Sequence, residues 1–203
     1  GKTTFLRHLN GLLMPSAGAV VIKGVPVKGN LLRARRMVGM VFQDADSQIV
    51  GETVREDVAF GPGNLGLDAG VVDRRTDLAL EKVGLSHKAD VSPHLLSGGE
   101  KRRLAIAGVL SMQPEIILFD EPFSNLDYPG ICQVVDQMKA LKIDGHTILV
   151  TSHDMDPVIG LADSLVILDK GRIVREGEPS RVAVEAAAFG IRPPAAYLQK
   201  EVG

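Results

Sequence analysis

A run of four apolar residues, Ile116–Phe119, that ends in Asp120 and Glu121 limits the possible folds of this chain more than any other feature. Such a run is typical of a strand that is buried on both faces, as strands are in a parallel sheet. Comparable apolar runs alternate with helical patterns along the chain, at 37–42, 146–151 and 164–169. This alternation predicts an α/β fold with a mostly parallel sheet covered by helices on both faces.

The composition narrows the class of protein. A chain of 203 residues is long enough for one well-buried domain, or for one domain with a small subdomain. The net charge of −2 gives no general attraction to polyanions, so we expect no nucleic-acid partner, and the net charge leaves a local basic patch open. Cys132 is the only cysteine, which excludes an intrachain disulfide and a cysteine metal cluster. No apolar run approaches the roughly 20 residues that a membrane span requires.

The first residues, Gly1-Lys2-Thr3-Thr4, precede a helical pattern that we expect to extend over 4–13. They match the second half of the phosphate-binding loop G-x-x-x-x-G-K-S/T, so we expect the first half of the loop and its strand upstream of Gly1. The backbone N–H groups at a helix N-terminus favour anions. Lys2 would add a charge toward the β- and γ-phosphates, and the Thr3 hydroxyl would bind Mg²⁺. By themselves these residues also fit a plain helix start.

The two carboxylates after the apolar run can have separate roles, because successive side chains of a strand point in opposite directions. Asp120 would hold Mg²⁺ through water, and Glu121 would polarise an attacking water molecule. The alternative is a solvated acidic turn. It is less favoured because Pro122 and the segment Ser-Asn-Leu-Asp at 124–127 follow directly.

The segment Ser97-Gly98-Gly99-Glu100 predicts the start of a helix over 97–112. Ser97 and Glu100 have the spacing of a capping box, which alone would explain both residues. It would not explain two glycines in the first turn, each of which costs about 1 kcal/mol relative to alanine. Glycines let a phosphate approach the backbone closely, so this segment favours a ligand.

Gln43 and His153 each follow an expected strand, and either one alone is more often structural than catalytic. Taken in order with the other motifs, they resemble the nucleotide-binding subunit of ATP-binding-cassette (ABC) transporters. The six matching segments are the end of the Walker A loop (1–4), the Q-loop (Gln43), the signature (96–100), the end of Walker B (119–122), the D-loop (124–127) and the H-loop (152–154). The resemblance covers most of residues 1–180.

This resemblance implies a P-loop NTPase fold whose first strands are missing from the chain. The implied division is a RecA-like core, first part (1–43), a helical subdomain with the signature (44–113), the second part of the core (114–180) and a C-terminal helical tail (181–203). It also implies a head-to-tail dimer of ATPase subunits that encloses two ATP molecules.

The resemblance further assigns roles to single residues. Gly1, Lys2, Thr3, Thr4, Ser97, Gly98, Gly99 and Asp127 would bind ATP, with the signature residues acting on the partner's nucleotide and Asp127 joining the two sites. Thr3, Gln43 and Asp120 would act with Mg²⁺. Glu121 would be the general base, and His153 and Gln43 would complete the catalytic set.

The segments 43–48 and 53–67 are similar to the ATPases of cobalt-type and energy-coupling-factor importers, although Asp44-Ala45 stands where the usual form has Asn-Pro. This implies uptake of a transition-metal ion (cobalt or nickel) or a vitamin, powered from the cytoplasmic face of the cell membrane. The partners would be a second ATPase subunit, identical or different, and an integral membrane subunit. We expect that subunit to dock on 48–62. The five histidines show no i, i+3 or i+4 pair, so we expect no cargo site in this chain.

Two alternatives stay open. One is another ABC-type ATPase, with a different import or export substrate or without a membrane partner. Only 54 positions separate Gln43 from Ser97, which leaves no room for the long coiled coils of repair-type members, and a single cassette is visible. The other alternative is an inactive truncated remnant.

Overall fold

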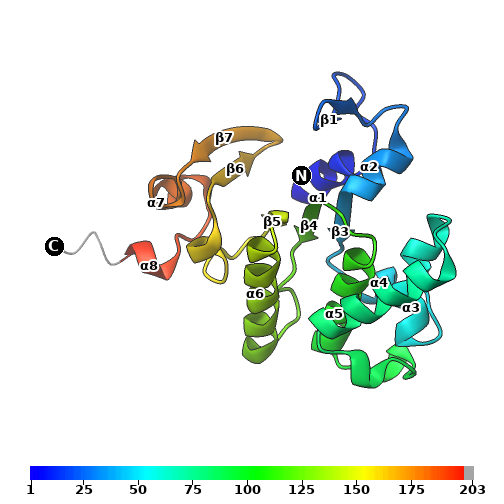
Figure 1. Ribbon diagram of the computed structural model, residues 1–203. Coiled ribbons are helices and arrows are strands. Elements are labelled where there is room, and N and C mark those ends of the chain that lie inside the picture. Colours follow the sequence, from blue (N-terminus) through cyan, green and yellow to red (C-terminus); the bar gives the residue numbers. More distant parts are fainter. Residues whose placement is uncertain (199–203) are drawn as a thin grey trace.

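The computed structural model describes residues 1–198 of the chain (Figure 1). Its centre is a parallel three-stranded sheet in the order β3-β4-β5, formed by β3 (Val38–Val41), β4 (Ile116–Asp120) and β5 (Thr147–Thr151). Val41 pairs with Phe119, and Asp120 pairs with Thr151. The carboxyl ends of the three strands therefore lie together at one edge, and the predicted α/β fold with a parallel sheet is confirmed.

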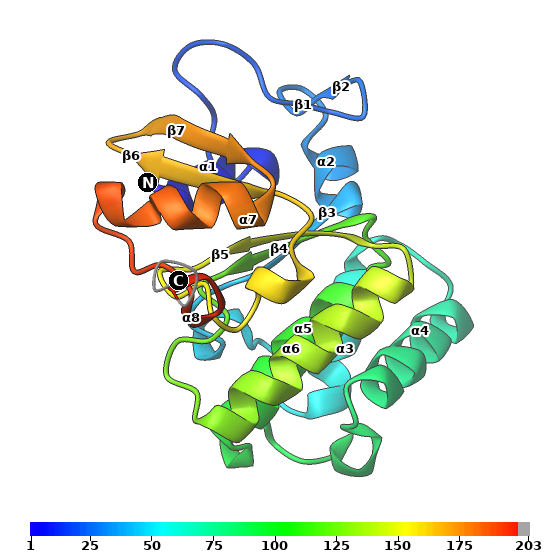
Figure 2. The ribbon, with the colours of Figure 1, turned by 90° about the vertical axis from the view of Figure 1, so that its left-hand side faces the viewer.

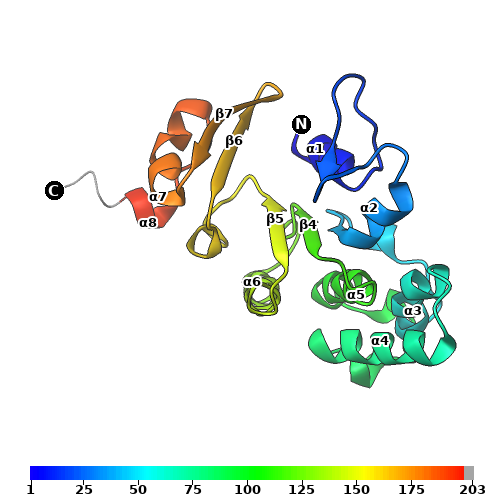
Figure 3. The same ribbon diagram turned by 45° about the horizontal axis from the view of Figure 1, so that its top comes forward.

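The middle strand β4 is buried on both faces. Ile117 and Phe119 pack on the side of α5 (Gly98–Leu110) and α6 (Tyr128–Ile143), and Leu118 packs on the side of α1 (Lys2–Leu9). All three side chains are fully buried, and each such burial contributes about 1.5–3 kcal/mol. Figures 2 and 3 show α5 and α6 beneath the sheet and α1 on its other face, so both faces are covered as expected.

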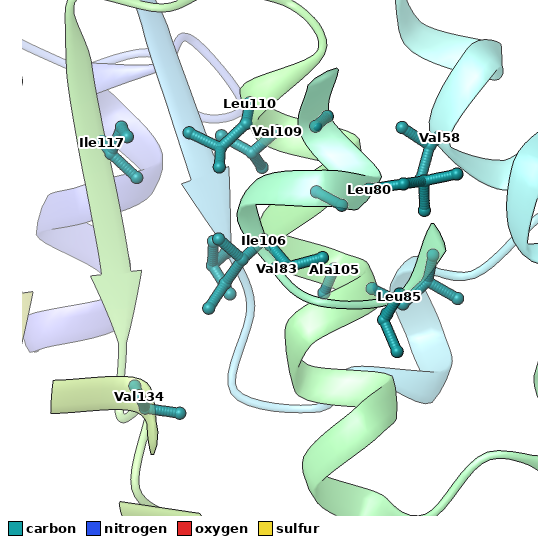
Figure 4. Close-up of a cluster of buried hydrophobic side chains, with 14 of the residues drawn as sticks. Val58, Leu80, Val83, Leu85, Ala105, Ile106, Val109, Leu110, Ile117 and Val134 are labelled. Carbon is teal, nitrogen blue, oxygen red and sulfur yellow. The ribbon is translucent and has the colours of Figure 1, made fainter. Parts of the chain in front are cut away.

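Residues 44–113 form a helical region beside the sheet. It contains α3 (Val54–Asn64), α4 (Ala69–Lys82), α5 and the short 3₁₀ helices Asp46–Gln48, Ser86–Lys88 and Pro93–Leu95. Val58 of α3 and Leu80 of α4 meet Ala105 and Val109 of α5 in a shared core that continues to the sheet (Figure 4). The proposed boundaries between subdomains stay predictions.

Glycine and proline predict two breaks in the helical pattern of this region, at Gly61-Pro62-Gly63 and at Gly66. The first prediction is wrong, because α3 continues through Pro62 to Asn64. Proline lacks the N–H group that would bind the carbonyl oxygen four residues earlier, at Val58. The hydroxyl of Ser111 donates a hydrogen bond of 2.8 Å to that oxygen instead. The break comes at Gly66, whose φ of 68° is in the left-handed region.

The N-terminal part differs from the expected elements in two places. The first helix ends at Leu9 rather than at residue 13, because Gly11 adopts a left-handed conformation with φ of 70°. A helix that the sequence did not suggest, α2 (Leu31–Met37), precedes β3 and buries Ala34 while its arginines stay exposed. The β-branched residues at 19–23 predict a strand, but the strand there has two residues, β1 (Val21–Ile22), and it pairs antiparallel with β2 (Val25–Pro26).

The C-terminal part begins with an antiparallel hairpin, β6 (Leu165–Asp169) and β7 (Arg172–Gly177). The sequence between the strands at 146–151 and 164–169 predicts a helix over 156–162, but only Ile159–Leu161 is helical, as a 3₁₀ turn. The carboxylate of Asp154 accepts a hydrogen bond from the backbone N–H of Asp156, a local bond that competes with a helix start. Three short helices follow: α7 (Pro179–Val182), a 3₁₀ helix (Ala183–Phe189) and α8 (Ala195–Leu198).

The last part of the predicted tail, 199–203, lies outside the described residues. Within residues 1–198, every helix is too short or too polar to cross a membrane.

Candidate functional site

Three side chains that can carry charge, Lys2, Glu121 and His153, meet at the carboxyl end of β4. The ammonium Nζ of Lys2 lies 2.9 Å from Glu121 Oε1, and His153 Nδ1 lies 2.8 Å from Glu121 Oε2. The backbone N–H of His153 also donates to Glu121 Oε2 at 3.2 Å. Residues from three separate sequence motifs therefore converge on one carboxylate.

Glu121 is held in a strained backbone conformation. Its φ of 46° is in the left-handed region, which is uncommon for a residue with a side chain and costs about 1–3 kcal/mol. Its backbone N–H donates to the carbonyl oxygen of Thr151 at 3.0 Å, which anchors the turn to β5. This turn brings the carboxylate to Lys2 and His153.

The carboxyl group of Glu121 is ionised at neutral pH. Burial by itself would raise its pKa, but the hydrogen bonds from Lys2 and His153, together with the charge of Lys2, outweigh burial and leave the pKa below its ordinary value. Only 11% of this side chain is exposed, whereas the ring of His153 is 75% exposed. The site thus presents a shielded carboxylate beside an accessible imidazole.

Asp120 is buried at the end of β4, and its Oδ1 accepts a hydrogen bond of 2.7 Å from the hydroxyl of Thr151. Thr151 was not among the expected site residues, although its place at the end of a neighbouring parallel strand could have suggested it. Asp120, the Thr3 hydroxyl and the Gln43 amide are hard oxygen donors, the kind that Mg²⁺ prefers. The donor set therefore fits the expected metal.

The expected phosphate-binding residues form the start of α1. Gly1 occupies the N-cap position, and Lys2, Thr3 and Thr4 make the first turn. The ion pair between Lys2 and Glu121 places this helix start at the carboxyl end of β4. Gln43 comes two residues after Val41, the last residue of β3, and Val41 pairs with Phe119, so Gln43 follows β3 at the same edge of the sheet at which Glu121 follows β4.

Arg102 is a residue that the sequence reasoning missed. It lies on α5 with 3% of its surface exposed, and its guanidinium donates to the carbonyl oxygens of Phe42 at 2.5 Å and Gln43 at 2.7 Å. Burial lowers the pKa of Arg102, and the nearby charge of Asp44 opposes that shift. Lys101 adds a second link, with Nζ 2.5 Å from Asp46 Oδ1. These contacts tie α5 to the Gln43 segment.

The predicted capping box at the start of α5 is confirmed. The backbone N–H of Glu100 donates to the Ser97 hydroxyl at 3.3 Å, and the backbone N–H of Ser97 donates to Glu100 at 2.9 Å. Hydrogen bonds from Lys88 and Ser97 lower the pKa of Glu100 to about 2. A Cβ atom added to Gly98 or Gly99 would meet no atom within 4 Å, so packing inside the chain does not require these glycines.

Asp127 begins α6, where its carboxylate accepts a hydrogen bond of 3.0 Å from the backbone N–H of Gly130. In the described part of the chain, neither Ser97 nor Asp127 is hydrogen-bonded to Lys2, Glu121 or His153. The structure therefore brings together one group of expected site residues, around Glu121, and leaves the signature and Asp127 at two other helix starts.

Comparisons with known proteins agree with this geometry. The protein family described as ABC transporter matches residues 1–124. The energy-coupling factor transporter ATP-binding protein EcfA of Methanocaldococcus jannaschii is 45% identical over 185 residues, which cover 90% of this chain and 66% of that protein. EcfA1 of Clostridium novyi is also 45% identical over 185 residues, with the same two coverages.

Among solved structures, CbiO1 from Clostridium perfringens, described as part of the ABC transporter complex cbiONQ, is similar with a TM-score of 0.83 and 33% identity. The match covers 100% of this chain and 83% of that one. The chain spans 66% of the length of the M. jannaschii protein and 61% of EcfA from Methanothermobacter thermautotrophicus, which is 44% identical over 189 residues.

Proposed function

Because the chain belongs to the ABC transporter family, we propose that it binds and hydrolyses ATP as the ATPase subunit of an energy-coupling-factor-type importer. The observation that carries this proposal is the ionised carboxylate of Glu121 at the end of β4, with Lys2 and His153 on its two oxygens. These are the groups that phosphoryl transfer to water needs at one place: a cation for the phosphates and a base or orienter for the water.

The start of α1 supports nucleotide binding. Gly1, Lys2, Thr3 and Thr4 would hold the phosphates, and Thr3, Gln43 and Asp120 would hold Mg²⁺. When bound, Mg²⁺ would neutralise charge on the phosphates. Lys2 pairs with Glu121 in this structure, so the phosphates would compete for its ammonium group and release the carboxylate. ATP binding itself would then prepare Glu121 for its role.

Glu121 would orient the attacking water and accept its proton, a role that typically contributes 10²–10⁴-fold in rate, as an order of magnitude. Its lowered pKa keeps it unprotonated and ready to accept at neutral pH. His153, which is mostly exposed while bound to Glu121, would contact the γ-phosphate. Gln43, which follows the end of β3, would bind Mg²⁺ and contact the attacking water.

A second ATPase subunit, identical or different, would complete each site. Ser97, Gly98 and Gly99 lie at the exposed start of α5, and nothing in the chain packs where a Cβ of either glycine would lie. Exposed backbone N–H groups at a helix N-terminus can bind the phosphate of a nucleotide that another subunit holds. Asp127 would join the two sites across the dimer.

The names of the relatives, which are ATP-binding proteins of energy-coupling factor transporters and a part of an ABC transporter complex, support a role in a transporter. We propose that this transporter is an importer, whose membrane subunit carries a transition-metal ion (cobalt or nickel) or a vitamin. The chain would then work at the cytoplasmic face of the cell membrane as a peripheral subunit. We place its core in 1–43 and 114–180, its helical subdomain in 44–113 and its tail in 181–203.

The segment 48–62 is our proposed docking site for the membrane subunit. Val50 and Phe60 are 60% and 55% exposed, so this segment presents two large apolar side chains to a partner. Buried Asp57 accepts hydrogen bonds from the backbone N–H groups of Val50 at 2.7 Å and Gly51 at 3.0 Å, so the loop has a fixed shape. A hollow of about 410 Å³ beside it is lined by Asp46, Ile49, Val50, Gly51, Glu52, Ser92 and His94.

To test this function, the full-length protein is co-purified with its membrane subunit. Mg²⁺-dependent ATP hydrolysis and transport are then measured on the complex. The double variant Arg55→Glu with Phe60→Ala should lose recruitment and transport but keep basal hydrolysis. Arg55 also pairs with exposed Asp77 at 2.6 Å, but such surface pairs contribute about 0–1 kcal/mol, so the fold should persist.

The matched control is Arg74→Glu with Leu78→Ala, on the exposed surface of α4. It should recruit the membrane subunit as the wild type does. Unchanged recruitment and transport in the Arg55 and Phe60 variant would refute the docking site, and an absence of ATP hydrolysis in the wild-type complex would refute the ATPase assignment.

A further inference from the structure

The charges of this chain are segregated along the sequence. The first 43 residues contain no Asp or Glu, and Asp44 is the first acidic residue. They carry a net charge of +7, whereas residues 44–203 carry −9. The seven cations are Lys2, Arg7, Lys23, Lys28, Arg33, Arg35 and Arg36. The overall charge of −2 therefore conceals a strongly basic N-terminal part.

Two of these cations have carboxylate partners in the described part of the chain: Lys2 pairs with Glu121, and Lys23 pairs with Glu115. The arginines of α2 are exposed and bind differently. Arg35 donates to the carbonyl oxygen of Gly11 at 3.3 Å, which leaves its charge without a counter-charge. The surface of α2 is therefore a concentrated positive patch.

Aliphatic side chains lie on the same surface. Leu32 is 61% exposed, Met14 is 43% exposed and Leu31 is 39% exposed. Atoms of Leu31 and Met14 both lie within 4 Å of the position that a Cβ of Gly11 would take, so these two side chains are neighbours. A hollow of about 400 Å³ at the start of α2 is lined by Gly29, Asn30, Leu31, Leu32, Arg33 and Arg36.

We propose that the α2 surface, formed by Met14, Leu31, Leu32, Arg33 and Arg36, contacts an anionic phospholipid bilayer. Basic side chains attract the anionic headgroups, and exposed aliphatic side chains enter the boundary between headgroups and acyl chains. The combination favours a lipid surface over a single-stranded nucleic acid, which is usually held by aromatic stacking, because Met14, Leu31 and Leu32 are aliphatic. A duplex would offer phosphates to the arginines but no apolar layer to these three side chains.

The position of the α2 surface agrees with this partner. The guanidinium of Arg36 lies 3.5 Å from the carbonyl oxygen of Leu65, at the C-terminal end of α3. α3 also carries Phe60, which is part of the proposed docking segment for the membrane subunit. The expected position of the bilayer therefore rests on the proposed function. Figure 1 shows α2 above α3 and α4 on the same side of the molecule. A bilayer that holds the membrane subunit would then lie beside the α2 surface.

The experiment measures sedimentation of the full-length protein with vesicles of phosphatidylcholine, with and without phosphatidylglycerol. Binding should require phosphatidylglycerol and weaken as salt rises, since exposed charges are screened. The double variant Leu32→Ala with Arg33→Ala should bind at least about fivefold more weakly, because one basic residue near an anionic surface alone contributes about that factor. Its ATP hydrolysis should be unchanged.

The matched control, Arg74→Ala with Leu78→Ala on α4, should bind the vesicles as the wild type does. Equal binding to pure phosphatidylcholine, or wild-type binding by the Leu32 and Arg33 variant, would overturn the proposal. Tighter binding to a DNA duplex, lost in the same variant, would overturn it in favour of a nucleic acid. If the double variant does not fold, Arg33→Gln alone tests the charge.

Vesicle binding requires neither ATP hydrolysis nor the membrane subunit. A protein that binds phosphatidylglycerol vesicles but does not hydrolyse ATP would refute the proposed function and keep the lipid contact. An active ATPase without vesicle binding would refute the lipid contact alone.

Discussion

Replacing Glu121 by glutamine should lower kcat for ATP hydrolysis by about 10²–10⁴-fold while ATP binding persists. Glutamine has nearly the same shape as glutamate but cannot accept a proton from water. It also ends the 2.9 Å ion pair with Lys2, which leaves that ammonium group available to the phosphates. ATP affinity should therefore be equal to or tighter than that of the wild type, as measured by nucleotide titration alongside steady-state hydrolysis.

The matched control is Glu115→Gln, which lies just before the other end of β4 and pairs with Lys23. This exposed carboxylate is far from the carboxyl edge of the sheet, so the variant should hydrolyse ATP at the wild-type rate. Hydrolysis by Glu121→Gln at a rate close to that of the wild type would show that the assignment of Glu121 is wrong.

The second large effect is expected at Arg102, which we regard as a positioning residue for Gln43. Replacing Arg102 by methionine keeps the length and apolar part of the side chain but removes both hydrogen bonds to the carbonyl oxygens of Phe42 and Gln43. Hydrogen bonds to a charged group contribute about 1.5–3 kcal/mol each, so kcat should fall at least about tenfold as Gln43 loses its fixed position.

Three measurements separate positioning from simple destabilisation. Hydrogen exchange should increase at residues 42–48, and Arg102→Lys should restore part of the rate through one remaining donor. Arg103→Met is the control, because the guanidinium of Arg103 donates to the carbonyl oxygen of Val83, within the helical region, rather than to Phe42 or Gln43. Equal losses of kcat in the two methionine variants, in step with their thermal stability, would contradict a positioning role.

The sequence predicts well those features that depend on local patterns. The run Ile116–Phe119 identified the central buried strand, because burial on both faces requires continuous apolar residues. The spacing of Ser97 and Glu100 identified the start of α5, because a capping box is a local hydrogen-bond pattern.

Features that depend on contacts between distant residues were not predictable. Pro62 continues a helix only because Ser111, 49 positions later, supplies a hydrogen bond to Val58. Nothing in the local sequence distinguishes Arg102 from Lys101 and Arg103, yet Arg102 alone of the three donates to both Phe42 and Gln43.

The candidate site, too, depends in part on contacts between distant residues that the sequence does not predict. The order of the motifs suggested that Lys2, Glu121 and His153 work together, and the structure brings them within hydrogen-bond distance. The ion pair between Lys2 and Glu121, and the support of Asp120 by Thr151, follow from how α1 and β5 pack beside β4. The roles of the individual residues, and of a strand upstream of Gly1, stay predictions.

We propose that two ATPase subunits enclose ATP between the start of α1 in one subunit and Ser97 in the other. Light scattering on the full-length Glu121→Gln variant measures the mass in solution with and without Mg²⁺ and ATP. The mass should double when both are added, and adding Ser97→Arg to the same variant should return it to that of one subunit while ATP still binds. A mass that stays at one subunit with ATP bound, or a dimer that Ser97→Arg leaves intact, would contradict the shared site.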